Sequence, residues 1–170
     1  MLSIELVTDA FGRVNAAVHS VLRDAGSEFL TFRPDPDANT VAWLIWHLTR
    51  VQDDHLADLR GGEQVWTGEG WAERFALPFD PAATGYGQSP DEVAAVRPGS
   101  ALLAGYHDAV HARTLAYLGT LAEADFARIV DTRWTPPVTL GVRLVSVIAD
   151  DLQHVGQAAY VRGMAERAGC

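Results

Sequence analysis

Residues 41–60 read VAWLIWHLTRVQDDHLADLR, and their apolar side chains recur every three or four positions, which predicts an α-helix with one buried face. The apolar stripe consists of Leu44, Leu48 and Val51 and ends at His55. We expect Asn39 to cap the start of this helix and Gly61-Gly62 to end it. The segment therefore predicts a core helix that carries a histidine, His47, at the edge of its apolar stripe.

The same spacing predicts three more long helices, over residues 3–26, 99–119 and 139–168, with Gly26 ending the first. The last helix carries two apolar faces, which predicts a position deep in a bundle. One face holds Leu144, Ile148, Leu152, Val155 and Ala159, and the other holds Val147, Ala158 and Val161. No alternating Val, Ile and Thr run predicts a strand. We expect an all-α four-helix bundle that forms one domain over residues 1–170.

Two long connections join these helices, residues 61–98 and 120–138. In the first, GWAERF (70–75) predicts a short helix, and the capping box of Ser89 and Glu92 predicts another. A connection this long and rich in aromatic residues is typical of a packed, functional loop. The chain has five tryptophans, and we expect them either to line a substrate pocket or to pack in the core: Trp43, Trp46, Trp66, Trp71 and Trp134.

The composition excludes several classes of protein. A net charge of −9 argues against binding nucleic acid or an anionic membrane surface. The single cysteine, Cys170, forms neither an internal disulfide nor a cysteine-rich zinc site. The chain has no basic start followed by an apolar run, and no stretch of 18 uncharged apolar residues, so we expect a cytoplasmic protein.

Asp150 and His154 are the strongest candidates for chemistry. They lie four positions apart on the last helix and therefore project from one face. A carboxylate in apolar surroundings is costly unless it is paired or bound to a cation. The chain contains no lysine, and Arg143 is a distant partner at seven residues. With His47 as a third ligand, the two histidines and one carboxylate would hold a divalent metal and leave open positions for water or substrate.

Two alternatives remain open at this point. His107 and His111 form a second pair at ligand spacing. Asp151 is three residues from His154 and could replace Asp150. His55 is two turns from His47, about 12 Å along the axis, so one ion cannot bind both. We interpret Asp53, Asp54 and His55 as boundary and surface residues.

Two segments resemble the DinB/YfiT-like superfamily of metalloproteins. AWLIWHLTRVQDDHLADL (42–59) is similar to its second helix, which carries a metal-binding histidine in a W-L-x-x-H-L setting. DDLQHVGQAAYVRG (150–163) is similar to its last helix, where an acid or histidine precedes a histidine by four residues. GWAERFALPFD (70–80) and HDAVHARTLAYL (107–118) look like actinobacterial members. The resemblance implies a four-helix bundle with metal ligands at His47, Asp150 and His154.

The superfamily includes metal-dependent thiol transferases and mycothiol-dependent maleylpyruvate isomerases, and the acid–x–x–x–His pair is more like the mycothiol-using branch. Those isomerases have a further C-terminal domain that takes part in catalysis, which argues against the isomerase reaction itself for a chain ending at residue 170. We expect an enzyme that uses a divalent ion (Zn, with Ni, Fe or Mn as alternatives) on a small thiol or thiol conjugate, or a related hydrolase. A non-enzymatic metal-binding or stress-response bundle is the rival. The resemblance also suggests a homodimer, which the apolar outer positions of the first helix permit.

Overall fold

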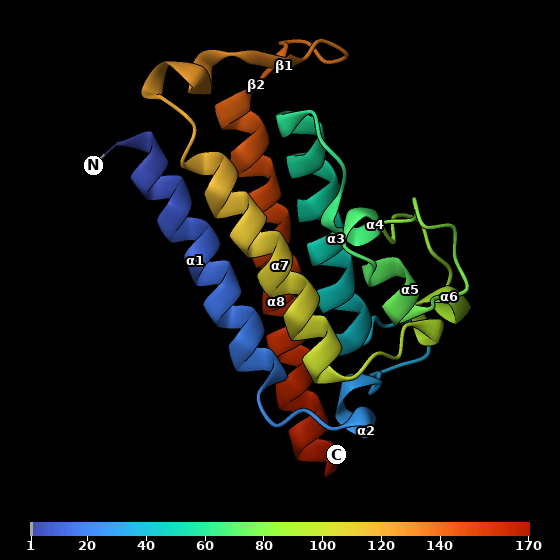
Figure 1. Ribbon diagram of the computed structural model, residues 1–170. Helices are drawn as coiled ribbons and strands as arrows, with labels where there is room; N and C mark the ends of the chain where they lie inside the picture. The colour runs from blue at the N-terminus through green and yellow to red at the C-terminus, as the bar shows by residue number, and fades with distance from the viewer. Residues whose placement is uncertain (1) are drawn as a thin grey trace.

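The computed structural model describes residues 2–170 and confirms the all-α four-helix bundle. Its long helices are α1 (Ser3–Leu22), α3 (Val41–Arg60), α7 (Ser100–Leu118) and α8 (Leu140–Ala168). They run alongside one another, and α1 and α3 each pack against both α7 and α8 (Figure 1). No helix in residues 2–170 has both the length and the apolar character needed to cross a bilayer.

The first long connection carries α4 (Val65–Gly68), α5 (Trp71–Phe75) and α6 (Pro90–Ala95), and it lies beside α3 (Figure 1). Two of these short helices were predicted. The capping box of α6 is present, because the Ser89 hydroxyl accepts from the Glu92 backbone N–H at 3.4 Å and the Glu92 carboxylate accepts from the Ser89 N–H at 2.7 Å. Because the connection lies beside α3, it covers the side of that helix that does not face the other long helices.

The second connection contains a feature that the sequence analysis missed. After a short 3-10 turn (Glu123–Ala127), β1 (Ile129–Asp131) pairs antiparallel with β2 (Val138–Thr139) over one end of the bundle (Figure 1). The expectation of no strands was thus wrong for this segment. A strand of three residues paired with one of two is too short to show the alternation on which strand prediction depends.

Two predicted helix boundaries were also wrong. α1 ends at Leu22, because Asp24 adopts a left-handed conformation with φ of 55°, and Gly26 caps the start of α2 (Ser27–Leu30) instead. α3 begins at Val41, where the Thr40 hydroxyl, and not Asn39, accepts the Trp43 N–H at 3.0 Å. Gly61 ends α3 as expected, at a φ of 64°.

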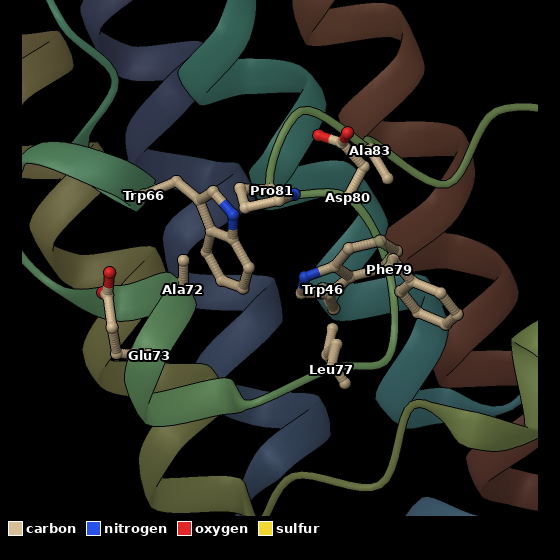
Figure 2. Close-up of a pocket in the computed structure, with 9 residues that line it drawn as sticks. All are labelled: Trp46, Trp66, Ala72, Glu73, Leu77, Phe79, Asp80, Pro81 and Ala83. Carbon is tan, nitrogen blue, oxygen red and sulfur yellow. The ribbon is translucent and has the colours of Figure 1, made fainter.

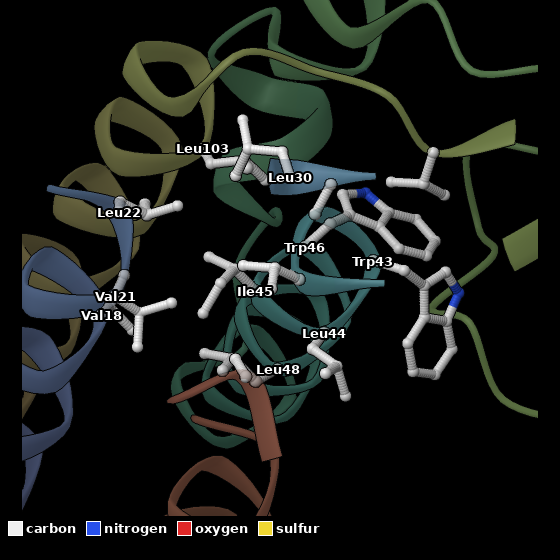
Figure 3. Packing of buried hydrophobic residues seen from close by; sticks show 14 of the residues in the cluster. Val18, Val21, Leu22, Leu30, Trp43, Leu44, Ile45, Trp46, Leu48 and Leu103 are labelled. Atoms are coloured by element: carbon white, nitrogen blue, oxygen red, sulfur yellow. The ribbon is translucent and has the colours of Figure 1, made fainter. Parts of the chain in front are cut away.

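The core lies around α3, whose residues 41–50 are all buried. Figure 3 shows Leu44, Ile45 and Leu48 of α3 among apolar side chains from α1, α2 and α7. α8 buries one face and not two, since Leu152 is 48% exposed. That buried face consists of Leu140, Leu144, Val147, Asp151, Val155, Ala158, Val161 and Ala165.

Candidate metal centre

Three side chains from two neighbouring helices meet between α3 and α8. His47 comes from the middle of α3, and Asp150 and His154 come from successive turns of α8. One ring nitrogen of each histidine and one carboxylate oxygen all lie within 4.8 Å of one another. No other three His, Cys, Asp or Glu side chains in residues 2–170 meet this condition. Small side-chain rotations bring such a group around one divalent cation.

Hydrogen bonds orient both imidazole rings. His47 Nδ1 donates to the Thr84 carbonyl oxygen at 2.5 Å, and His154 Nδ1 donates to Gln157 Oε1 at 2.9 Å. A carbonyl oxygen only accepts, so each Nδ1 carries a proton, and in the neutral ring each Nε2 keeps its lone pair. Metal-binding histidines commonly donate their second nitrogen to a carbonyl in this way. The two Nε2 atoms are therefore prepared to bind a cation.

Asp150 fits a cation as well. Its Oδ1 lies 3.6 Å from His154 Nε2, and its Oδ2 is buried without a hydrogen-bond partner among the described residues. Interaction with His154 lowers the pKa of Asp150, and interaction with Asp150 raises the pKa of His154. Burial lowers the pKa of His47. The site thus presents a carboxylate and a neutral imidazole at neutral pH, and the unpartnered Oδ2 is the atom that a cation would satisfy.

Trp43 forms one wall of the site, and two of the three candidate ligands are partly exposed to solvent. Its indole stacks on the His47 ring, with ring centroids 4.5 Å apart, and donates to Gln88 Oε1 at 2.7 Å. His47 is buried, whereas Asp150 and His154 are only half-buried. Three protein ligands with an accessible side are typical of catalytic metal sites, while structural zinc sites are closed by four.

Gly85 allows the chain to pass against His47. A Cβ atom at this position would lie 2.6 Å from His47 Nδ1 and 3.1 Å from ring atoms of both Trp43 and Trp46. The residue also has a φ of 99°, which favours glycine. The carbonyl of its neighbour Thr84 can reach His47 only because residue 85 has no side chain.

Arg50 fixes the same segment from one turn further along α3. Its buried guanidinium donates to the carbonyl oxygens of Pro81 at 3.2 Å and Ala83 at 3.1 Å. It also donates to Gln64 Oε1 at 2.7 Å. Residues 81–84 therefore attach to α3 through three backbone carbonyls, two bound by Arg50 and one by His47.

Asp53 was read from the sequence as a boundary or surface residue, and this was wrong. Its side chain is 2% exposed, lies 3.9 Å from Arg50, and accepts from the Tyr106 hydroxyl at 2.9 Å. It also accepts the backbone N–H groups of Val65 at 2.9 Å and Trp66 at 2.7 Å, at the start of α4. No pattern of spacing marks this role, because its partners are backbone groups of a distant loop.

The histidine pair of α7 does not join a third ligand. His107 is fully buried, and its Nδ1 donates at 3.1 Å to the Thr49 hydroxyl, whose own proton goes to the Ile45 carbonyl. The rings of His107 and His111 are 6.4 Å apart. Burial lowers the pKa of His107 to about 3. This residue is a neutral core histidine.

The remaining candidates lie outside the group. Asp151 is 0% exposed and faces the core. His55 accepts from Arg143 at 3.1 Å, and Arg143 also pairs with Asp131 of β1 at 2.9 Å. Arg143 thus forms its ion pair with Asp131 of β1 and is no partner of Asp150.

The tryptophans separate into different roles. Trp43 lies beside the histidines, Trp46 and Trp66 line a cavity under the first connection, and Trp71 packs against Tyr106. Trp134 is 65% exposed and lines neither place. Trp134 therefore lies in neither the core nor a pocket, the two locations that the sequence left open for the tryptophans.

The chain is thus an all-α four-helix bundle with a candidate metal site of two histidines and one carboxylate. The DinB superfamily profile matches residues 10–158, so the chain belongs to the DinB superfamily. It is similar to a crystal structure described as a conserved protein of locus from Enterococcus faecalis, with 32% sequence identity and a TM-score of 0.88. That match covers 95% of this chain and 96% of the other. No curated protein matches the chain.

Proposed function

We propose that this protein is a metal-dependent enzyme that acts on a small thiol or thiol conjugate, with one divalent cation bound by His47, Asp150 and His154. The observation that carries the proposal is the convergence of these three side chains within 4.8 Å, with Asp150 Oδ2 buried and unpartnered in the described structure. Zn²⁺ is the first cation to test, and Ni²⁺, Fe²⁺ and Mn²⁺ accept the same ligands.

The chemistry follows from the open side of the site. A divalent cation held there lowers the pKa of a thiol or water next to it and so supplies a nucleophile at neutral pH. The chain itself positions the candidate ligands. Thr84 and Gln157 orient the two imidazoles, and Trp43 keeps water from one side of His47. None of the three ligands needs to transfer a proton.

An adjoining groove supports a substrate larger than water. It has a volume of about 430 Å³ between the start of α3 and α8, and Gln157, the hydrogen-bond partner of His154, lines it. Leu44, Tyr160 and Val161 give it apolar walls. A groove of this volume accommodates a small organic conjugate. Mycothiol, used by the isomerases that the chain resembles, is the first thiol to screen.

Metal content tests the ligand assignment. Protein purified without a histidine tag would be analysed by mass spectrometry beside His47→Ala, Asp150→Ala and His154→Ala. We expect about one ion per chain in the wild type and a loss in each variant. His19→Ala is the matched control, because His19 is an exposed histidine paired with Asp108 on another face. Wild-type protein that stays metal-free after reconstitution would contradict the proposal.

Cobalt substitution separates the enzyme from its rival, a non-enzymatic metal-binding bundle. Co²⁺ absorbance reports the ligands around the ion. If a small thiol enters the open position, its addition changes the visible spectrum, and a thiol screen for transfer activity is justified. A spectrum unchanged by mycothiol and other small thiols would support the binding protein.

We also propose a homodimer that packs through α8. Val142, Val145 and Leu152 lie along its outer face and are 57%, 60% and 48% exposed. They recur at intervals of three and seven residues, the spacing of a helix–helix contact. Leu152→Glu should convert the protein to a monomer in size-exclusion chromatography with light scattering, while Leu6→Glu on α1 should not. A monomeric wild type would exclude the dimer.

A further inference from the structure

A second cavity lies under the first long connection, apart from the metal centre. Its volume is about 180 Å³, and none of His47, Asp150 and His154 lines it. Figure 2 shows Trp46 and Trp66 facing each other across the space, with Leu77 and Phe79 forming further walls. The two indoles meet edge to face, with ring centroids 6.3 Å apart. The walls are thus mostly aromatic and apolar.

Two buried hydrogen-bond donors belong to these walls. Trp46 and Trp66 are 1% and 3% exposed, and in the described residues neither indole N–H has an acceptor. In Figure 2 the Trp46 nitrogen points into the space between Trp66 and Leu77, and the Trp66 nitrogen points toward Pro81, another lining residue. A buried N–H without an acceptor is unfavourable. The Trp46 donor, which points into this space, would be satisfied by an acceptor atom on a bound molecule.

Size and charge narrow the class of ligand. A cavity of 150 Å³ takes up benzene, so about 180 Å³ admits one six-membered ring with a small substituent. The only charged side chains in the lining, Glu73 and Asp80, are carboxylates. They lie exposed at the mouth of the cavity and disfavour an anion.

We propose that this cavity is a binding site for a small, uncharged or cationic aromatic molecule whose ring carries a hydrogen-bond acceptor, such as a phenolic hydroxyl. The ring packs against Trp46, Trp66 and Phe79, which line the cavity together. The acceptor takes the hydrogen bond of an indole N–H. An amine on the ligand would face Glu73 and Asp80 at the mouth. The site does not depend on a metal, because it shares no residue with the metal centre.

Phenol titration into ¹⁵N-labelled protein tests the proposal. Each indole N–H gives its own signal, which Trp46→Phe and Trp66→Phe assign. We expect the Trp46 and Trp66 signals to shift saturably with phenol. Trp71 and Trp134 are internal controls, since neither lines the cavity. Toluene, which has the same ring without the acceptor, should bind on the order of fivefold more weakly, and 4-hydroxybenzoate should bind more weakly than phenol because of its charge.

A filled cavity gives the matched control. Ala72 lines the cavity, and Ala72→Leu should abolish the shifts, while Ala82→Leu, on an exposed residue of the same connection outside the lining, should leave them unchanged. Circular dichroism verifies that both variants are folded. No saturable shift, equal shifts at Trp71 and Trp134, or equal binding by Ala72→Leu would each overturn the proposal.

Discussion

At the scale of single residues, Gly85 offers a sharp test of the metal centre. In Gly85→Ala the new Cβ lies 2.6 Å from His47 Nδ1, so the imidazole has to move and its bond to the Thr84 carbonyl is lost. Loss of such an outer contact typically costs 10–100-fold in metal affinity. We expect a fall of at least about tenfold, measured by competition with a chelating dye.

Gly87→Ala is the control for backbone strain. Gly87 also has a positive φ, 72°, but a Cβ there meets no atom within 4 Å. Its metal affinity should stay at the wild-type value. Equal affinity in both variants and the wild type would show that His47 is not held by this contact.

His107 makes stability depend on pH. The unfolded chain binds a proton at His107 near pH 6.5, whereas burial keeps the folded chain from doing so until about pH 3. Stability is therefore lost as the pH falls below 6.5. Between pH 7 and pH 5 the loss from this residue is about 2 kcal/mol, at 1.36 kcal/mol per pH unit. Urea unfolding at the two pH values should show this loss, and His107→Gln should remove it.

The exposed His19 provides the comparison for His107. Its side chain is 46% exposed, and it lies on α1 beside Asp108. His19→Gln should keep the difference of about 2 kcal/mol that burial of His107 produces between pH 7 and pH 5. A His107→Gln variant with the wild-type pH dependence would assign the effect to another group.

At the scale of elements, Arg50 attaches the first connection to α3. Arg50→Met removes the donors to the Pro81 and Ala83 carbonyls and leaves the Asp53 carboxylate buried without its cation. Breaking a buried pair from one side costs about 3–5 kcal/mol. We expect that loss in urea unfolding, and cleavage near residues 79–88 by a low concentration of protease. Arg74→Met, on an exposed arginine of α5, should change neither. If protease left the first connection uncleaved in Arg50→Met, Arg50 would not be what attaches this connection to α3.

The helices and the connections differ in how well the sequence predicts them. The four long helices were predictable because their periodicity extends over five or more turns and depends on local spacing. Asp150 and His154 were predictable for the same reason, since they share one helix face. His47 was proposed as the third ligand from its residue type and its place on another helix, and the resemblance to a family supported that choice. Thr84, Gly85 and Arg50 could not be found, because backbone carbonyls and a missing side chain leave no pattern in the sequence.

At the scale of the whole molecule, the candidate ligands join α3 and α8, which are separated by about eighty residues of chain. Folding alone brings His47 to Asp150 and His154, so an ion held by these three residues would bind the folded state in preference to the unfolded one. Mass action then stabilises the fold by about 2.7 kcal/mol when the free ion is at 100 times its Kd. For a chain of 170 residues, each kcal/mol raises Tm by about 2–4 °C.

We therefore expect Zn²⁺ to raise Tm by about 5–10 °C over protein treated with a chelator, measured by differential scanning calorimetry. His154→Ala should unfold at the same temperature with and without the ion, because one of the two ligands that α8 contributes is gone. His111→Ala, on a half-buried histidine outside the group, should retain the full rise. A rise that survives in His154→Ala would place the stabilising ion elsewhere, and no rise in the wild type would mean that the two helices are held by apolar packing alone.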